Sequence, residues 1–473
     1  MLEHEDAALQ QYQRSLIGDP VADRAVYEAC SPITHIHQIQ APLLVLQGDN
    51  DIRVPKGEAM QVESILKAWV HLDRDAASRV AVQRDIEARE GRFMGPLHGV
   101  PVALKDIYDA AGLVTTSGVG AWGHRRPTVD AVSVARLRAA GAVILGKVTT
   151  TPFALRDPTA TCNPWNPGHT PGGSSSGSGA AVGSRMVPLA LGTQTVGSVL
   201  RPAAYCGAVG FKPTHGRISA VGVTPLAWSL DHVGVLCRSV EDAALALAVM
   251  AGHDPADPHS AAMPVEDYLA ALAAPAAPRI GVLRPLIERA EPANAAQIEA
   301  TLAALRAAGA QVEEAPLAAS FEGLHAAGDI VSRSEAAAFH RDLYARHSAE
   351  YPKHIGEAVK AGHGIAAVDY IAAQARRRAF RNDMGAVAAR YDALVSPTAA
   401  GPAPKGLEST GDPYYCAPWS FAGMPSISLP TGLAPDGLPF AVQLSGAPWC
   451  EARLLAAAAW CERVIGFKET PRA

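Results

Sequence analysis

The sequence lacks several features that would place the protein in a specialised class. It has no run of about 18 uninterrupted apolar residues, and residues 1–6 carry neither the basic nor the apolar region of a signal peptide. Long runs of lysine or arginine are also missing, and the formal net charge is −5 at pH 7, which argues against a basic surface for nucleic acid or a membrane. We therefore expect a cytoplasmic protein that acts on a small molecule, without a nucleic acid or membrane partner.

Paired cysteines are missing as well. The seven cysteines are widely scattered and never form a Cys-x-x-Cys pair, the spacing that is typical of zinc sites and redox motifs. We expect reduced, buried thiols, no metal site and no cofactor. Hydrophobic residues make up 48% of the 473 residues and charged residues 18%, so the composition is that of a globular protein with a large core.

The start of the chain differs in pattern from the remainder. An apolar run, Leu43–Leu46, precedes a Gly/Asp turn that contains Asp51, which predicts a buried strand and a loop. This segment resembles the end of a prolyl-oligopeptidase-type α/β-hydrolase domain, in which an aspartate at the place of Asp51 orients a catalytic histidine. A Gly-x-Ser-x-Gly elbow should come first, and the preceding residues contain none. We therefore expect residues 1–67 to be a hydrolase-like remnant without catalytic activity.

Residues 68–473 alternate helical patterns with short apolar strands. This alternation predicts a single α/β domain, with a sheet that helices cover on both faces. Alanine-rich stretches favour the helices and allow them to pack closely. The predicted strands are 141–147, 187–191, 279–283, 393–396, 427–430 and 440–444, and the predicted helices are 130–140, 295–308, 366–391 and 451–465.

Two segments carry residues suited to nucleophilic catalysis. Gly172–Gly179 is a Gly/Ser-rich run, which taken alone is typical of a flexible linker. An apolar strand follows soon after it, so the run is held at the edge of a core, where small residues let the backbone approach a substrate. Lys105 ends an apolar stretch, Val100–Leu104. It is either a strand-end lysine that reaches solvent or a buried lysine whose lowered pKa leaves a neutral amine as a base.

These residues, together with several separated motifs, resemble the amidase signature family. The similarity extends over residues 68–473, and the order of the motifs along the chain matches that of the family. It implies the fold of the family, a central mixed β-sheet covered by helices on both faces. The motifs are Leu97–Val102, Pro164–Pro167, Arg201–Gly207, Gly210–Thr214, Ser229–Gly234 and Gly423–Pro430.

The resemblance also implies a catalytic triad of Ser198, Ser174 and Lys105. Ser198 would attack the substrate carbonyl, Ser174 would carry the proton to the leaving amine, and neutral Lys105 would accept a proton from Ser174. Water would then cleave the acyl-enzyme. The family has a cis peptide bond at the place of Gly173–Ser174. The oxyanion hole would be formed by the backbone N–H groups of Thr195, Val196, Gly197 and Ser198.

Substrate contacts are predicted at Gln194 and Arg201. In malonamidase-like relatives, an arginine at the place of Arg201 reads a substrate carboxylate; the alternative is an internal ion pair that fixes the helix. Val196 stands where many members of the family have glycine, and we expect the loop to tolerate its branched side chain. An aromatic wall near the entrance, or else ordinary core packing, is indicated by Tyr414, Tyr415, Trp419 and Phe421.

The predicted function is hydrolysis of a carboxylic amide through an acyl-enzyme on Ser198, with side activity on anilides, esters or carbamates. The sequence leaves the oligomeric state open, with a homodimer as one alternative. A glutamine-amidotransferase A-type subunit is the first alternative, although its loop normally reads Asp-Thr-Gly-Gly where this chain has Gln194 to Gly197. The second alternative is a catalytically inactive fusion that only binds ligands.

Overall fold

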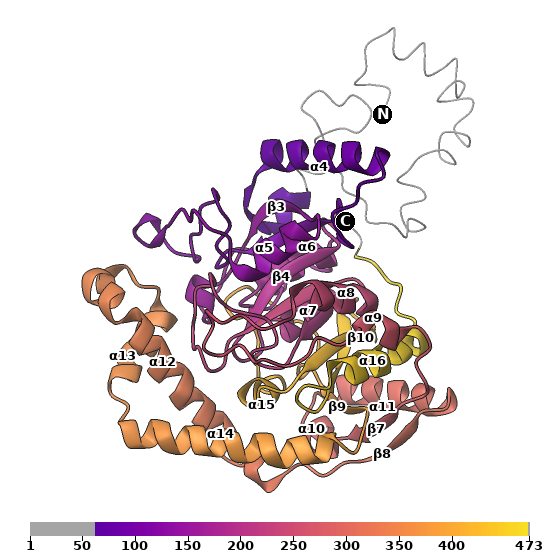
Figure 1. The fold of residues 1–473 in the computed structure, drawn as a ribbon. Coiled ribbons are helices and arrows are strands. Elements are labelled where there is room, and N and C mark those ends of the chain that lie inside the picture. Colours follow the sequence, from indigo (N-terminus) through magenta and orange to yellow (C-terminus); the bar gives the residue numbers. More distant parts are fainter. Residues whose placement is uncertain (1–61, 472–473) are drawn as a thin grey trace. The chain divides into compact units, whose positions relative to one another are not determined.

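Eleven strands of the described residues form one mixed sheet. The structure is a computed structural model that describes residues 62–471 (Figure 1), so Asp51 and most of the predicted remnant lie outside the described residues. The strand order is β1-β3-β2-β4-β6-β5-β10-β11-β9-β7-β8. The strands are β1 (Trp69–Leu72), β2 (Pro101–Lys105), β3 (Val143–Val148), β4 (Leu189–Gln194), β5 (Val209–Lys212), β6 (His232–Cys237), β7 (Arg279–Val282), β8 (Gln311–Glu314), β9 (Ala393–Pro397), β10 (Ser426–Leu433) and β11 (Pro439–Ser445).

Both parallel and antiparallel pairs occur in this sheet, as the resemblance implies. Strand β2 runs parallel to β3 and β4, and β7 runs parallel to β8 and β9. The central pairs, β4 with β6 and β5 with β10, are antiparallel. Strands β2, β3, β4 and β6 are buried along their whole length, which explains why their apolar residues occur next to one another rather than alternating with polar ones.

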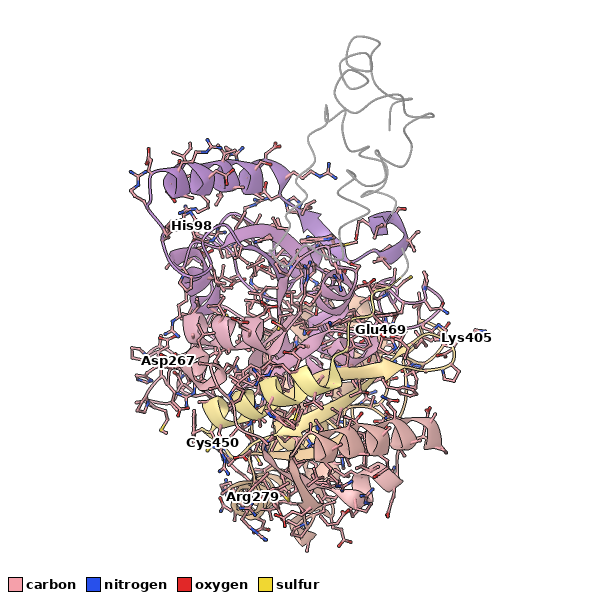
Figure 2. The ribbon with its side chains drawn as sticks, turned by 90° about the vertical axis from the view of Figure 1, so that its right-hand side faces the viewer. His98, Asp267, Arg279, Lys405, Cys450 and Glu469 are labelled. Carbon is pink, nitrogen blue, oxygen red and sulfur yellow. The ribbon has the colours of Figure 1, made fainter. Side chains whose placement is uncertain are left out.

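Helices cover both faces of the sheet. On β9, Val395 packs in one core cluster with residues of α11 and α16, whereas its neighbour Leu394 packs in another with residues of α12 and α14. Figure 2 shows α16, which begins just after Cys450, against the C-terminal strands. The helices are α4 (Arg74–Arg89), α5 (Val132–Ala139), α6 (Ser176–Gly183), α7 (Leu200–Cys206), α8 (Val240–Met250), α9 (Tyr268–Leu272), α10 (Arg284–Glu288), α11 (Pro292–Ala307), α12 (Leu324–His347), α13 (Lys353–His363), α14 (Ala367–Ala388), α15 (Ala417–Phe421) and α16 (Glu451–Ile465).

Local sequence signals set several helix boundaries. Ser239 caps α8 in a capping box with Asp242, and Pro292 opens α11. Glycines in the left-handed conformation end α7 at Gly207 and α16 at Gly466. No helix within residues 62–471 is long and apolar enough to cross a membrane.

The predicted elements are present, with shifted boundaries. Helix 451–465 is found as predicted, helix 366–391 ends at Ala388, and strand 187–191 lies instead at Leu189–Gln194. Strands β1, β5, β6 and β8 were not predicted. The edge strands β1 and β8 are exposed or half-buried and carry polar residues, whereas β5 and β6 are short buried segments that contain glycine. All six described cysteines are free thiols, as expected, and Cys30 lies outside the described residues.

Candidate active site

Lys105 stands at the carboxyl end of β2, where no part of its side chain reaches solvent. Its Nζ lies 2.7 Å from Ser174 Oγ and 2.8 Å from Thr193 Oγ1. Burial lowers its pKa from 10.5 to about 7, although the charge of Asp231 acts in the opposite direction. The alternative of a lysine that reaches solvent is therefore wrong, and an amine that is partly neutral at pH 7 contacts the Ser174 hydroxyl.

The Gly/Ser-rich run is part of the core and not a flexible linker. All of its residues are buried, and the run leads directly into α6. A Cβ at Gly172, which has φ of +81°, would lie 2.9 Å from the Pro202 backbone, so only glycine fits there. The Gly173–Ser174 peptide bond is cis, as predicted. These contacts place Ser174 opposite the lysine.

Ser198 lies in the loop between β4 and α7. It lines a cavity of about 760 Å³ together with Ser174 and the other residues of its loop, Thr195, Val196 and Gly197. The same cavity is bordered by the start of α12 and by residues 408–414. The two serines and the four residues predicted for the oxyanion hole therefore border one cavity, and the lysine contacts it through Ser174.

Gln194 binds other protein groups through its side chain instead of facing the cavity, in contrast to the predicted substrate contact. Its side chain is fully buried, and its Oε1 accepts hydrogen bonds from the N–H groups of Val199 and Leu200 at 2.8 and 2.9 Å. Its Nε2 donates to Ser420 Oγ at 2.9 Å. Because both ends of the amide bind protein groups, Gln194 caps the start of α7 and fixes the loop that carries Ser198.

Val196 fits its loop without strain. It is not among the described non-glycine residues with positive φ, so the branched side chain occupies an ordinary backbone conformation. Its carbonyl accepts a hydrogen bond from Ser420 Oγ at 2.8 Å, and its side chain packs against a core cluster that includes residues of α15. The expectation that the loop tolerates valine is confirmed.

Asp231 supports the loop from the other side, a role that the sequence alone did not reveal. Thr195 Oγ1 donates to its Oδ1 at 2.5 Å, and the N–H groups of Leu226 and Ala227 donate to its Oδ2 at 2.8 and 3.0 Å. Burial raises the pKa of Asp231 to about 6. Its place within the family motif Ser229–Gly234 was the only signal for this residue.

Arg201 makes no ion pair with any described residue. Its guanidinium is buried at the wall of the cavity, and Nη2 donates to the Gly173 carbonyl at 2.7 Å and to Thr410 Oγ1 at 3.2 Å. Its Nε and Nη1 have no hydrogen-bond partner among the described residues. The internal ion pair considered as an alternative is therefore absent, and the arginine steadies the peptide that carries Ser174.

The predicted aromatic wall is half correct. Tyr414 and Phe421 line the cavity, whereas Tyr415 and Trp419 are buried in the core. Residues 417–421 form α15, so successive side chains point in different directions around the helix axis. The sequence could not separate the two pairs because all four are aromatic and close together along the chain.

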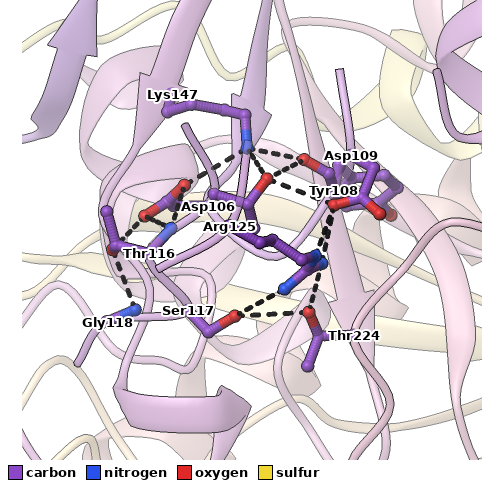
Figure 3. Close-up of polar contacts among 10 residues, drawn as sticks. Asp106, Tyr108, Asp109, Thr116, Ser117, Gly118, Arg125, Lys147 and Thr224 are labelled. Carbon is purple, nitrogen blue, oxygen red and sulfur yellow. Dashed lines mark hydrogen bonds and ion pairs between the residues drawn. The ribbon is translucent and has the colours of Figure 1, made fainter. Parts of the chain in front are cut away.

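A buried polar network around Lys147 and Asp106 fixes the backbone next to Lys105 (Figure 3). Lys147 Nζ lies 3.2 Å from Asp106 Oδ1, and both side chains are fully buried. Lys147 also donates to the Tyr108 carbonyl and to Thr115 Oγ1, at 2.5 and 3.0 Å. Because Asp106 follows Lys105 directly, this ion pair holds the end of β2 in place.

Comparison with known proteins agrees with this arrangement. Residues 57–455 match the family described as Amidase, and residues 1–90 match the prolyl oligopeptidase family. The chain belongs to the amidase signature family. It carries in addition an N-terminal prolyl-oligopeptidase segment.

Individual members of the amidase signature family are similar over most of their length. An amidase of Pseudomonas putida is 38% identical over 418 residues, with 85% of this chain and 89% of the relative covered. The A-type subunit of the glutamyl-tRNA(Gln) amidotransferase from Anaeromyxobacter sp. (strain K) is 37% identical over 445 residues, with 86% and 90% covered. The solved peptide amidase from Stenotrophomonas maltophilia has a TM-score of 0.75 and 33% identity, with 87% of this chain and 93% of the other covered.

Proposed function

We propose that this member of the amidase signature family hydrolyses a carboxylic amide through an acyl-enzyme on Ser198. The observation that carries the proposal is the 2.7 Å separation of Lys105 Nζ and Ser174 Oγ. This contact is buried, next to a cavity that Ser198 also lines. A neutral amine in that place makes a hydroxyl more basic without histidine or metal.

The proposed reaction assigns one role to each of the three residues. Lys105 accepts the Ser174 proton, Ser174 accepts the proton of Ser198, and the Ser198 oxygen attacks the substrate carbonyl. The proton then returns through Ser174 to the leaving nitrogen, the C–N bond breaks, and water cleaves the resulting ester by the reverse relay. Backbone N–H groups of residues 195–198 stabilise the negative oxygen that forms in each half of the reaction.

Amides that carry a carboxylate are the favoured substrate class within this proposal. A buried guanidinium without an acidic partner is costly unless an anion neutralises it. Among the described residues no carboxylate lies within ion-pair distance of Arg201, although the charge of Asp412 opposes the lowering of its pKa by burial, and Arg201 lines the same cavity as Ser198. The alternative is that Arg201 acts only on the Gly173 carbonyl, to which it donates at 2.7 Å. In that case Arg201→Met would slow neutral and carboxylate-bearing amides equally, whereas a carboxylate reader would lose the charged amides selectively.

The matched test is labelling with a serine-reactive fluorophosphonate, together with a screen of aliphatic amides, anilides, carbamates and esters. Wild-type protein should be labelled at Ser198 and should hydrolyse amides. Ser198→Ala should do neither, and Ser178→Ala should behave as wild type, because the Ser178 hydroxyl is buried in α6 and donates to the Leu191 carbonyl. A labelled Ser198→Ala protein would refute the assignment, and an unlabelled wild type would favour an inactive fusion.

A glutamine-amidotransferase A-type subunit is the second candidate, because similarity to the Anaeromyxobacter amidotransferase chain covers most of this protein. Gln194 and Val196 argue against it, since they replace residues of the Asp-Thr-Gly-Gly loop. Amide hydrolysis by the purified chain alone would support the amidase. Glutaminase activity that appears only with added partner subunits would support the amidotransferase.

We also propose that residues 1–67 form a remnant without hydrolase activity and that residues 68–473 form the amidase domain. Separate matches of residues 1–90 to the prolyl oligopeptidase family and of residues 57–455 to the Amidase family support a division of the chain into two segments. Asp51→Asn should leave amide and ester hydrolysis unchanged. A loss of ester hydrolysis in that variant, with labelling of Ser198 intact, would contradict the division.

A further inference from the structure

A second cavity adjoins the catalytic one, and a pair of stacked side chains belongs to the walls of both. This neighbouring cleft has a volume of about 570 Å³. His325 and Tyr414 line the cleft and also line the cavity that contains Ser198. They are the residues that the two linings share. The remaining residues of the cleft are Pro285, Leu317, Ala318, Ala319, Phe321, Glu322 and Gly323.

The two rings are held in a parallel stack. Their centroids lie 4.4 Å apart and their planes differ by 13°. The Arg289 guanidinium lies over the Tyr414 ring, 4.2 Å from its centroid, which is a cation–π contact. His325 belongs to the first turn of α12, and Tyr414 follows the loop 408–413 that borders the catalytic cavity. The partition is therefore made of two side chains from separate elements and not of backbone.

The cleft behind this partition suits an apolar group. Leucine, alanine, proline and phenylalanine side chains provide most of its wall. The Phe321 ring stands edge-on to both rings, with its centroid 5.6 Å from that of His325 and 6.3 Å from that of Tyr414. Burial lowers the pKa of His325, although the charges of Asp412 and Asp329 act in the opposite direction, and this burial favours the neutral imidazole in the stack. A hydrocarbon chain that extends from the catalytic cavity would meet these two rings before it reaches the cleft.

We propose that His325 and Tyr414 set the upper length limit of the substrate, so that an apolar chain extending from the scissile amide ends at their stacked rings. The proposal rests on the proposed function, since it concerns the same cavity. Removal of the tyrosine ring joins the two cavities and turns a short-chain amidase into one that accepts long-chain amides.

The test measures kcat/KM along two substrate series. One series runs from acetyl to dodecanoyl p-nitroanilides, and the other from N-methylacetamide to N-decylacetamide, so that chains on either side of the scissile bond are sampled. In Tyr414→Ala, the ratio of kcat/KM for the longest to the shortest substrate should rise at least about tenfold in one series, the effect of two newly buried methylene groups. Tyr414→Phe keeps the ring and should retain the wild-type ratio, and His325→Ala should change it in the direction of Tyr414→Ala.

A binding measurement separates this proposal from the proposed function. Calorimetry with Ser198→Ala protein gives the affinities of dodecanamide and N-decylacetamide without turnover. Adding Tyr414→Ala should tighten one of them at least about tenfold, even if no amide is ever hydrolysed. Unchanged affinities, or an unchanged ratio of long to short substrates in an active and folded Tyr414→Ala enzyme, would overturn the proposal.

Discussion

The electrostatic coupling between Lys105 and Asp231 makes the pH dependence of the reaction a direct test of the relay. Burial lowers the pKa of Lys105 from 10.5 to about 7, and the Asp231 charge raises it. At pH 7, about half of the amines are then neutral, compared with about one in 3,000 for a lysine with a pKa of 10.5. The proposed base is the neutral form of Lys105, so kcat/KM should rise with pH and reach a plateau above neutrality.

The magnitude follows from the pKa. One pH unit below a pKa of about 7, about one-tenth of the amine is neutral, so kcat/KM at pH 6 should be about tenfold below the plateau. Asp231→Asn removes the negative charge and keeps an oxygen that accepts the N–H groups of Leu226 and Ala227. The pKa of Lys105 should therefore fall, and the acid limb of the profile should move to lower pH; the difference should be largest above pH 6, where the wild-type Asp231 carboxylate is charged.

Asp257→Asn is the matched control. Its carboxylate is also buried and also accepts two backbone N–H groups, at 2.8 Å each, but its charge does not influence the pKa of Lys105. The assay is kcat/KM for one short amide between pH 5 and pH 9 in the three proteins. A flat wild-type profile, or an acid limb that moves to higher pH in Asp231→Asn, would refute the role of neutral Lys105.

Three further outcomes follow from the contacts of the site. We expect kcat/KM to fall by about a thousandfold or more in each of three single variants, Lys105→Met, Ser174→Ala and Ser198→Ala. Double variants should lose little beyond the single ones because the three groups act as a unit. Additive losses in single-turnover assays would contradict a shared relay. Gln194→Met should lower the free energy of unfolding, measured by urea titration, by about 2 kcal/mol or more, since two buried N–H groups at the start of α7 lose their acceptor. Gln194→Glu keeps an acceptor oxygen, so its free energy of unfolding should fall by less. Lys147→Met should lower the free energy of unfolding by about 3–5 kcal/mol because it leaves Asp106 buried without its ion-pair partner. The double variant Lys147→Met/Asp106→Asn should recover part of that loss. Equal stability of the single and double variants would show that the charge of Asp106 is not the cause.

The sequence by itself determined the α/β alternation, the family and the three residues proposed to react. Helix 451–465 was predicted at its observed bounds because an alanine-rich run ends at a glycine, which are local signals. The edge strands β1 and β8 were missed because their stability comes from pairing with β3 and β7, which lie far away along the chain.

Only the tertiary structure decided what surrounds those residues. The pKa of Lys105 depends on its complete burial between neighbouring strands, and a sequence pattern does not give the degree of burial. The capping role of Gln194, the hydrogen bond from Arg201 to the Gly173 carbonyl and the support from Asp231 all depend on contacts between segments that the fold brings together. The stacked partition of His325 and Tyr414 joins residues almost ninety positions apart along the chain, so it exists only once the chain has folded.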